Sequence, residues 1–208
     1  MPLQNRVTPL GEIVATPARG TFMGNRGILH DERKMLGRAR WRHNNWVTCL
    51  LSFHARRRSV MAPGRYTELF FLDEAVALAA GHRPCGECRR ERYRAYLDLW
   101  ATSCADLAPA KPKDIDRALQ AARIDAKSKT QRHILSEIDG LPDGAFILQG
   151  DTPMLVQGTG LFPYTPAGYG PAAPRPIGGT VKVLTPEPSL RILRAGYGPT
   201  IHPSAMPL

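Results

Sequence analysis

Two cysteines separated by two residues, Cys85 and Cys88, constrain the fold of this chain more than any other feature. This spacing allows both sulfur atoms to face one metal ion, because the intervening turn directs backbone N–H groups toward them, and it supplies half of a tetrahedral zinc site. Upstream, Asp73 is a suitable N-cap for a short helix that Gly81 would end. Downstream, Arg89 to Trp100 has apolar residues at helical spacing. We therefore expect the pair to lie on a rigid turn between two helices.

The composition indicates a folded, water-soluble protein. The chain has 208 residues, 43% of them hydrophobic, which is enough for one substantial core or two small ones. No run approaches the roughly 18 apolar residues of a membrane span, and residues 1–20 are too polar for a signal peptide. Two of the four cysteines have metal-binding spacing and two are isolated, which favours a reducing compartment. We expect a cytoplasmic protein with no membrane partner.

Positive charge is concentrated in the N-terminal half. The formal net charge is +10; residues 1–100 contain 17 Lys and Arg against 9 Asp and Glu, whereas residues 101–208 contain 11 against 9. Such an excess favours nucleic acid, most simply DNA, as the partner, with phosphate contacts that weaken as salt increases. The alternative is a basic surface that only maintains solubility.

Arginines are clustered in several places along this half. Arg38, Arg40 and Arg42 alternate around Ala39 and Trp41, so on a strand they would form a row on one face beside an aromatic ring. A row of this kind suits a surface that follows a phosphate backbone. We expect nucleic-acid contacts from eight arginines: Arg38, Arg40, Arg42, Arg56, Arg57, Arg58, Arg89 and Arg90.

The second half of the chain predicts a helix followed by short strands. A proline-containing linker at 108–113 precedes Asp114, a good N-cap for a helix through about Ile124. Four short β-prone runs separated by turn residues then indicate a small β-meander: Ala145 to Gln149, Met154 to Gln157, Leu161 to Tyr164 and Thr180 to Leu184. We predict an α+β fold with a small antiparallel sheet and flanking helices around the Cys-x-x-Cys turn. Residues 1–106 would form one unit and residues 107–208 a second, packed against it or separate.

One stretch also resembles a known family. A double Phe at 70–71, an alanine-rich helix and the run Ala80 to Arg89 (AGHRPCGECR) occur in the same order as in the zinc-binding domain of the DNA-repair regulator Ada. The resemblance covers about residues 46–91. It implies a zinc module that acts on DNA, in repair or in the response to DNA damage.

The resemblance also implies a role for Cys49. It lies where the family places its first zinc cysteine, which as a thiolate accepts a methyl group from a DNA phosphotriester. The family has its second cysteine four residues later, where this chain has Phe53, followed by His54. Two outcomes stay open. His54 completes a site with Cys49, Cys85 and Cys88, or the metal is lost and the cysteines are free thiols.

Three functional hypotheses follow. The first is a DNA-binding module with a structural zinc ion, and the second is a methyl acceptor that uses Cys49. The third is a nucleic-acid-processing enzyme that depends on a metal or on His30, His43 or His54. Because Trp46 to Phe53 is a β-prone, mostly apolar run, we expect it to be largely buried, with Cys49 poorly accessible to a methyl donor.

Overall fold

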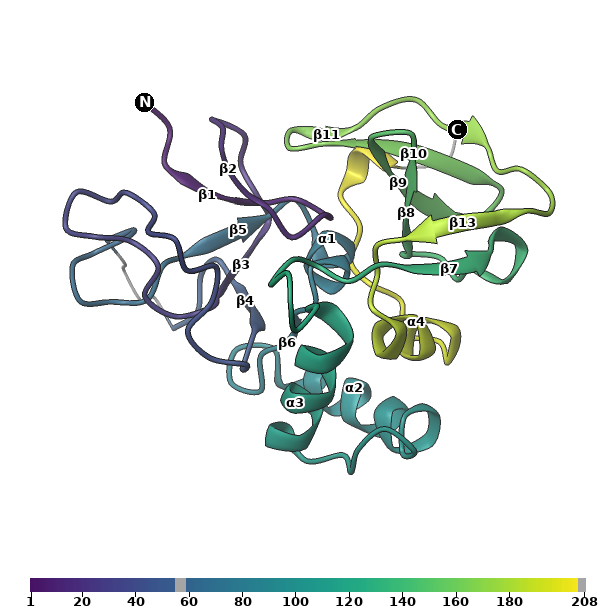
Figure 1. The fold of residues 1–208 in the computed structure, drawn as a ribbon, viewed down its shortest axis with the longest axis horizontal. Helices are drawn as coiled ribbons and strands as arrows, with labels where there is room; N and C mark the ends of the chain where they lie inside the picture. The colour runs from purple at the N-terminus through teal and green to yellow at the C-terminus, as the bar shows by residue number, and fades with distance from the viewer. Residues whose placement is uncertain (55–58, 206–208) are drawn as a thin grey trace.

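The computed structural model describes residues 1–54 and 59–205, and within these residues the chain forms an α+β fold with two β-sheets. Figure 1 shows the short helix α1 between the two sheets and the helices α2, α3 and α4 below them. The predicted α+β class is confirmed. One hydrophobic cluster combines Phe71 and Ala75 with Phe146 and Leu155, so the two predicted units share a core.

The first sheet contains six strands in the order β2-β1-β5-β3-β4-β6. It is mixed rather than antiparallel throughout, because β5 runs parallel to β1 and β6 runs parallel to β4. Its strands are β1 (Gln4–Val7), β2 (Ile13–Ala15), β3 (Phe22–Asn25), β4 (Val47–Leu50), β5 (Leu69–Phe71) and β6 (Arg83–Pro84). Strand β6 is only two residues long, so β4 lies close to the edge of the sheet.

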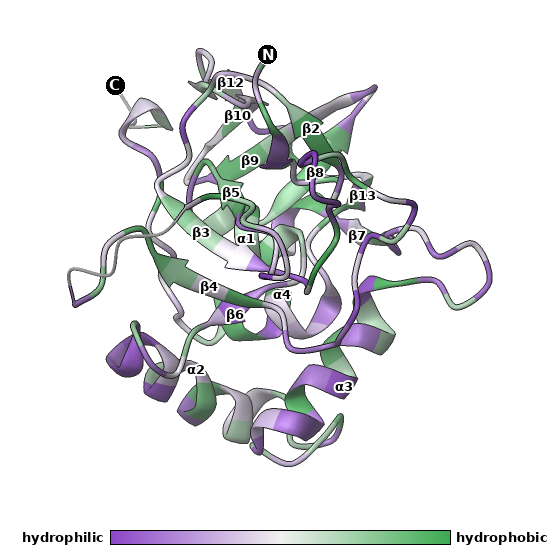
Figure 2. Cartoon of the chain, turned by 90° about the vertical axis from the view of Figure 1, so that its left-hand side faces the viewer, coloured by the Kyte–Doolittle hydropathy of each residue, from purple (hydrophilic) through white to green (hydrophobic). Residues whose placement is uncertain are grey.

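The second sheet is antiparallel and is built around the predicted meander β8-β9-β10. Strands β13 and β7 extend it on one side, and β11 and β12 pair with β10 on the other. Its strands are β7 (Ile134–Glu137), β8 (Phe146–Gln149), β9 (Thr152–Gln157), β10 (Gly160–Thr165), β11 (Gly168–Tyr169), β12 (Ala173–Pro174) and β13 (Thr180–Val183). Figure 2 shows that much of the central strand surface is hydrophobic, as expected for sheets that face a shared interior.

Helix α1 (Glu74–Ala79) is buried along its whole length. The Asp73 side chain accepts a hydrogen bond from the Val76 N–H at 2.9 Å, which confirms the predicted N-cap. Gly81 has φ of 79° and ends the helix as predicted. The helix is thus fixed at both ends directly before the cysteine turn.

Three longer helices pack under the sheets. They are α2 (Arg90–Ser103), α3 (Pro112–Arg123) and α4 (Glu187–Arg194); two single 3-10 turns occur at Ile138–Gly140 and Pro203–Ala205. Each of these helices contributes to a second hydrophobic cluster, α2 through Trp100, α3 through Leu119 and α4 through Leu190. Among the described residues, no helix combines the length and the apolar composition needed to cross a lipid bilayer.

A late segment of the chain is anchored to the start of α1. The Tyr197 hydroxyl donates to the Glu74 carboxylate at 2.5 Å, and the His202 backbone N–H donates to Asp73 at 2.9 Å. The Tyr169 hydroxyl donates to the same Asp73 carboxylate at 2.7 Å. Two carboxylates at the start of one helix therefore bind two later segments of the chain, one at Tyr169 and one at Tyr197 to His202.

Two predictions about secondary structure need correction. Helix α3 begins at Pro112, with Asp114 in its first turn rather than at its N-cap, because proline is well suited to the first helical position. The residues Arg38, Arg40 and Arg42 lie in a loop between β3 and β4, not on a strand. Strands β1 and β7 and helix α4 were not predicted.

Replacing Gly81 by alanine should lower the free energy of unfolding more than replacing Gly64 by alanine. Both glycines have positive φ, 79° and 70°, so each substitution carries a strain of about 1–2 kcal/mol. A Cβ on Gly81 would also lie 2.4 Å from Cδ of buried Arg123, whereas a Cβ on Gly64 would meet no atom of the described residues within 4 Å. This overpacking should add about 1–3 kcal/mol. Urea unfolding measures both variants, and equal losses would contradict the role of the Arg123 contact.

Candidate metal centre

Three cysteines meet at the edge of the first sheet. Cys49 is the third residue of β4, and the turn that carries Cys85 and Cys88 directly follows β6. The backbone N–H of Cys85 donates to the carbonyl oxygen of Thr48 at 3.0 Å, which fixes the turn beside β4. The three sulfur atoms all lie within 4.8 Å of one another. This cluster can hold a metal ion.

Backbone N–H groups point at the sulfurs. The N–H of Glu87 donates to Sγ of Cys85 at 3.4 Å, and the N–H groups of Cys88 and Leu50 interact with Sγ of Cys85 and of Cys88 respectively. Such donors stabilise a thiolate. The short Cys-x-x-Cys turn therefore has the local geometry that its spacing predicts.

The three thiols affect one another's ionisation. A hydrogen bond from the Cys49 thiol lowers the pKa of Cys85 to about 5, helped by the backbone N–H groups. The pKa of Cys49 is raised by its bond to Cys85 and by burial, and burial raises the pKa of Cys88. The cluster by itself thus holds one thiolate readily and resists a second negative charge. A cation bound between the sulfurs would remove this repulsion.

The fourth predicted ligand, His54, does not join the cluster. Its side chain is exposed and its ring lies 4.0 Å from that of Phe53 between centroids. Its backbone has a positive φ of 50°. The structure therefore brings together three of the four predicted ligands.

The prediction that Cys49 lies in a largely buried run is wrong in part. Strand β4 ends at Leu50, and Leu50 and Leu51 are 38% and 51% exposed. Cys49, Cys85 and Cys88 are half-buried. Strand β6 pairs only with Val47 and Thr48, so the end of β4 that carries Cys49 and Leu50 extends beyond this strand.

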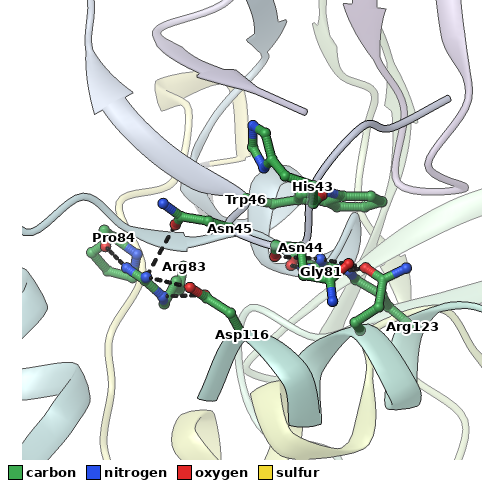
Figure 3. A network of polar contacts seen from close by, with 10 residues as sticks. His43, Asn44, Asn45, Trp46, Gly81, Arg83, Pro84, Asp116 and Arg123 are labelled. Atoms are coloured by element: carbon green, nitrogen blue, oxygen red, sulfur yellow. Dashed lines mark hydrogen bonds and ion pairs between the residues drawn. The ribbon is translucent and has the colours of Figure 1, made fainter. Parts of the chain in front are cut away.

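Helix α3 is attached to the segments that lead into Cys49 and into the cysteine turn (Figure 3). Arg83 of β6 donates to Asp116 from Nε at 2.7 Å and from Nη2 at 2.9 Å, and its Nη2 also donates to the side chain of Asn45 at 3.1 Å. The side chains of Arg83 and Asp116 are 5% and 10% exposed, so water screens this ion pair weakly. One carboxylate on α3 thus positions the segments before Cys49 and before Cys85.

Arg123, the last residue of α3, completes this attachment. Arg123 donates to the carbonyl oxygens of Gly81 at 2.6 Å and Asn44 at 2.7 Å (Figure 3). Its guanidinium carbon lies 3.6 Å from the centroid of the Trp46 ring. Burial lowers the pKa of Arg123, since the charged form loses its hydration. The Arg123 side chain therefore holds both segments that lead to the metal centre, residues 44–46 before β4 and Gly81 before β6.

The predicted nucleic-acid-binding arginines differ in their exposure to solvent. Arg38, Arg40, Arg42 and Arg90 are exposed. Arg89 is 6% exposed and pairs with the Glu74 carboxylate at 2.8 Å, so it does not reach the surface. The remaining three, Arg56, Arg57 and Arg58, lie outside the described residues.

The two other histidines of the enzyme hypothesis make separate contacts. His30 is buried, with Nδ1 2.7 Å from the Thr67 hydroxyl, and His43 is exposed, with Nε2 3.1 Å from Oδ1 of Asn25. Within the described part of the chain, neither ring bonds to a carboxylate that could make it a general base.

Sequence reasoning missed the positioning roles of Asp116 and Arg123, because their partners are distant in the sequence.

Comparison with known proteins gave no match to a protein family, to a characterised protein or to a solved structure.

Purified protein should contain close to one metal ion per chain, and Cys85→Ser should lose it together with stability. Binding energy in small metal sites contributes directly to folding. Elemental analysis and thermal unfolding measure the two effects. Cys104→Ser is the matched control, because Cys104 is buried in the second hydrophobic cluster, away from the metal centre. Metal-free wild-type protein with the same melting temperature as Cys85→Ser would rule out the site.

Proposed function

We propose that this protein binds nucleic acid, with DNA as its partner, and that a structural zinc ion at Cys49, Cys85 and Cys88 stabilises the binding module. The observation that carries the proposal is the cluster of three sulfur atoms within 4.8 Å, in the N-terminal half where positive charge is concentrated. The resemblance to the Ada zinc-binding domain suggests a role in DNA repair or in the response to DNA damage.

The donor set favours zinc over other divalent ions. Thiolates are soft ligands that select zinc over magnesium or calcium, which prefer oxygen. Sulfur atoms about 2.3 Å from one ion in a tetrahedral arrangement lie about 3.8 Å apart, which is compatible with the observed spacing. These three side chains would hold the ion, and the described residues place no fourth His, Cys, Asp or Glu in the cluster.

Charge and exposure support a polyanionic partner. Arg38, Arg40 and Arg42 are exposed on one loop, which also carries half-buried Trp41. Trp46 follows, and its ring packs against that of Trp41 at a centroid distance of 6.1 Å with the ring planes tilted by 57°. Exposed arginines beside an aromatic ring can contact phosphates and stack on a base. The loop ends at β4, so a rigid metal centre would hold one end of this surface in place.

Changing Arg38, Arg40 and Arg42 together to glutamate should weaken DNA binding and reduce its salt dependence. Each lost phosphate contact should lower the log–log salt slope by about one. Fluorescence anisotropy with labelled DNA and RNA duplexes and single strands, across a series of salt concentrations, measures both effects and identifies the preferred nucleic acid.

The control for this experiment is Arg194→Glu. Arg194 is exposed on α4, far along the chain from the basic loop that carries Arg38, Arg40 and Arg42, and it donates to the Gly140 carbonyl at 3.1 Å. The Arg194→Glu change should leave DNA binding nearly unchanged. If the triple variant binds as tightly as wild type and with the same salt slope, the positive charge serves solubility and the proposed function fails.

Methyl transfer to Cys49 is the second candidate function, and half-burial of this residue favours it. We nevertheless expect no methylation. The described residues gather three thiols rather than four, so the site carries less negative charge than a four-thiolate site and each sulfur is a weaker nucleophile. Mass spectrometry of the Cys49 peptide after exposure to DNA with methylated phosphates tests this. One added methyl group per chain would make the protein an acceptor.

A further inference from the structure

A cavity of about 680 Å³ lies away from the three cysteines. Its wall is formed by the loop before β2 with β2 itself, by Trp41 and Trp46, and by the segment that follows α3. This volume is in the range of small-molecule sites in proteins. The metal centre does not account for it, and the loop that carries Arg38, Arg40 and Arg42 contributes Arg40 and Trp41 to its wall.

The wall of this cavity contains a buried arginine with unused hydrogen-bonding capacity. Arg26 is 2% exposed, and its Nη1 donates to the Gly11 carbonyl at 3.0 Å. Its Nε and Nη2 are enclosed by protein atoms and have no hydrogen-bond partner among the described residues. These two nitrogens form one edge of the guanidinium, which binds two oxygens of a carboxylate or phosphate in parallel.

Arg83 shows which partner the Nε and Nη2 edge of a buried guanidinium needs. Arg83 uses its Nε and Nη2 to bind both oxygens of Asp116, at 2.7 and 2.9 Å. Arg26 is at least as deeply buried as Arg83, at 2% against 4% exposure, yet no carboxylate occupies the equivalent edge among the described residues. A buried charge without a partner is costly, and a bound anion would supply the missing oxygens.

The charges around the cavity favour a doubly charged anion. Arg26, Arg40, Arg123 and Lys129 line it, and Glu12 is the single acidic residue in the wall. Arg123 is held by neutral oxygens from Gly81, Asn44 and Gln120, so its charge is not cancelled within its own hydrogen bonds.

A third unsatisfied donor or acceptor belongs to a residue of the same wall. His133 lines the cavity, and its Nε2 is buried without a hydrogen-bond partner. Trp41, which is half-buried in the wall, offers apolar surface beside the charged groups. Convergent polar groups with an aromatic neighbour are typical of a small-ligand site.

We propose that this cavity binds the phosphate group of a small phosphate monoester, and that the enclosed guanidinium of Arg26 turns toward it so that the Nε and Nη2 edge holds two phosphate oxygens. Arg40 and Lys129, exposed at the rim, attract the dianion. The Arg123 charge deepens the positive potential of the inner wall. The site shares Arg40 and Trp41 with the loop that carries Arg38, Arg40 and Arg42, but it does not require that loop to bind nucleic acid. A terminal phosphate on an oligonucleotide is the other source of the same chemical group.

Isothermal titration calorimetry of the full chain with inorganic phosphate, with a 5′-mononucleotide and with acetate tests the proposal. Phosphate and the mononucleotide should bind at least about tenfold more tightly than acetate, because the excess positive charge favours a dianion. Arg26→Gln should weaken phosphate binding by at least about tenfold, and Arg26→Lys should restore only part of it, since lysine has no planar fork.

A second pair of variants keeps the test valid if Arg26 is needed for folding. Lys129→Gln removes an exposed charge from the cavity and should weaken phosphate binding several-fold. Lys127→Gln is the control, because this lysine is exposed on the same segment but does not line the cavity. Equal effects of the two lysine changes, or no phosphate binding by the folded wild-type protein, would overturn the proposal.

Two further comparisons use the same calorimetry. Binding of a short oligonucleotide with a 5′-phosphate is compared with binding of the same oligonucleotide without it, which identifies a terminal phosphate as the source. Phosphate and DNA binding by Arg38→Ala and by Lys129→Gln are compared to separate the cavity from the loop that carries Arg38. Arg38 does not line the cavity, so Arg38→Ala should spare phosphate binding even where it weakens DNA binding. Mononucleotide binding by a protein that binds no DNA would support the cavity while rejecting the proposed function.

Discussion

The buried ion pair between Arg83 and Asp116 connects the two halves of this protein at the point where its candidate chemistry lies. Arg83 belongs to the segment that leads into the cysteine turn, and Asp116 belongs to a helix of the second half. Removing one partner of such a pair typically costs about 3–5 kcal/mol, because the other charge stays buried without compensation. The sulfur cluster therefore depends on a helix that contributes no sulfur to it.

Several arginines in this fold are buried over aromatic rings. Arg26 and Arg123 both lie over Trp46, at 4.1 and 3.6 Å from the ring centroid, and Arg89 lies over Phe22 at 4.6 Å. Of these three, only Arg89 also has a carboxylate partner, Glu74. Aromatic faces and backbone carbonyls offset part of the lost hydration without cancelling the charge. The interior near Trp46 thus keeps a positive potential that an anion from solution can use.

The sequence predicts the local features of the fold well and the long-range ones poorly. The N-cap at Asp73, the stop at Gly81 and the cysteine turn each follow from residues a few positions apart, and the structure has all three. The attachment of Arg123 to Asn44 spans 79 residues, so no spacing rule could reveal it. Helix α4 escaped prediction because it is short and lies directly after a proline-containing turn. His54 lies apart from the sulfurs and has a positive φ, and no spacing rule in the sequence separates this outcome from a fourth ligand.

The anchoring of the late segment at Tyr197 and His202 to the start of α1 has a consequence for biosynthesis. These contacts join residues 123 and 129 positions apart. Until that segment has left the ribosome, the Asp73 and Glu74 carboxylates at the centre of the molecule lack the donors that it supplies. Contacts of such separation form late, because a long loop must close first. The central helix, and the turn that follows it, therefore lack these contacts while the 123 to 129 residues between the partners are synthesised.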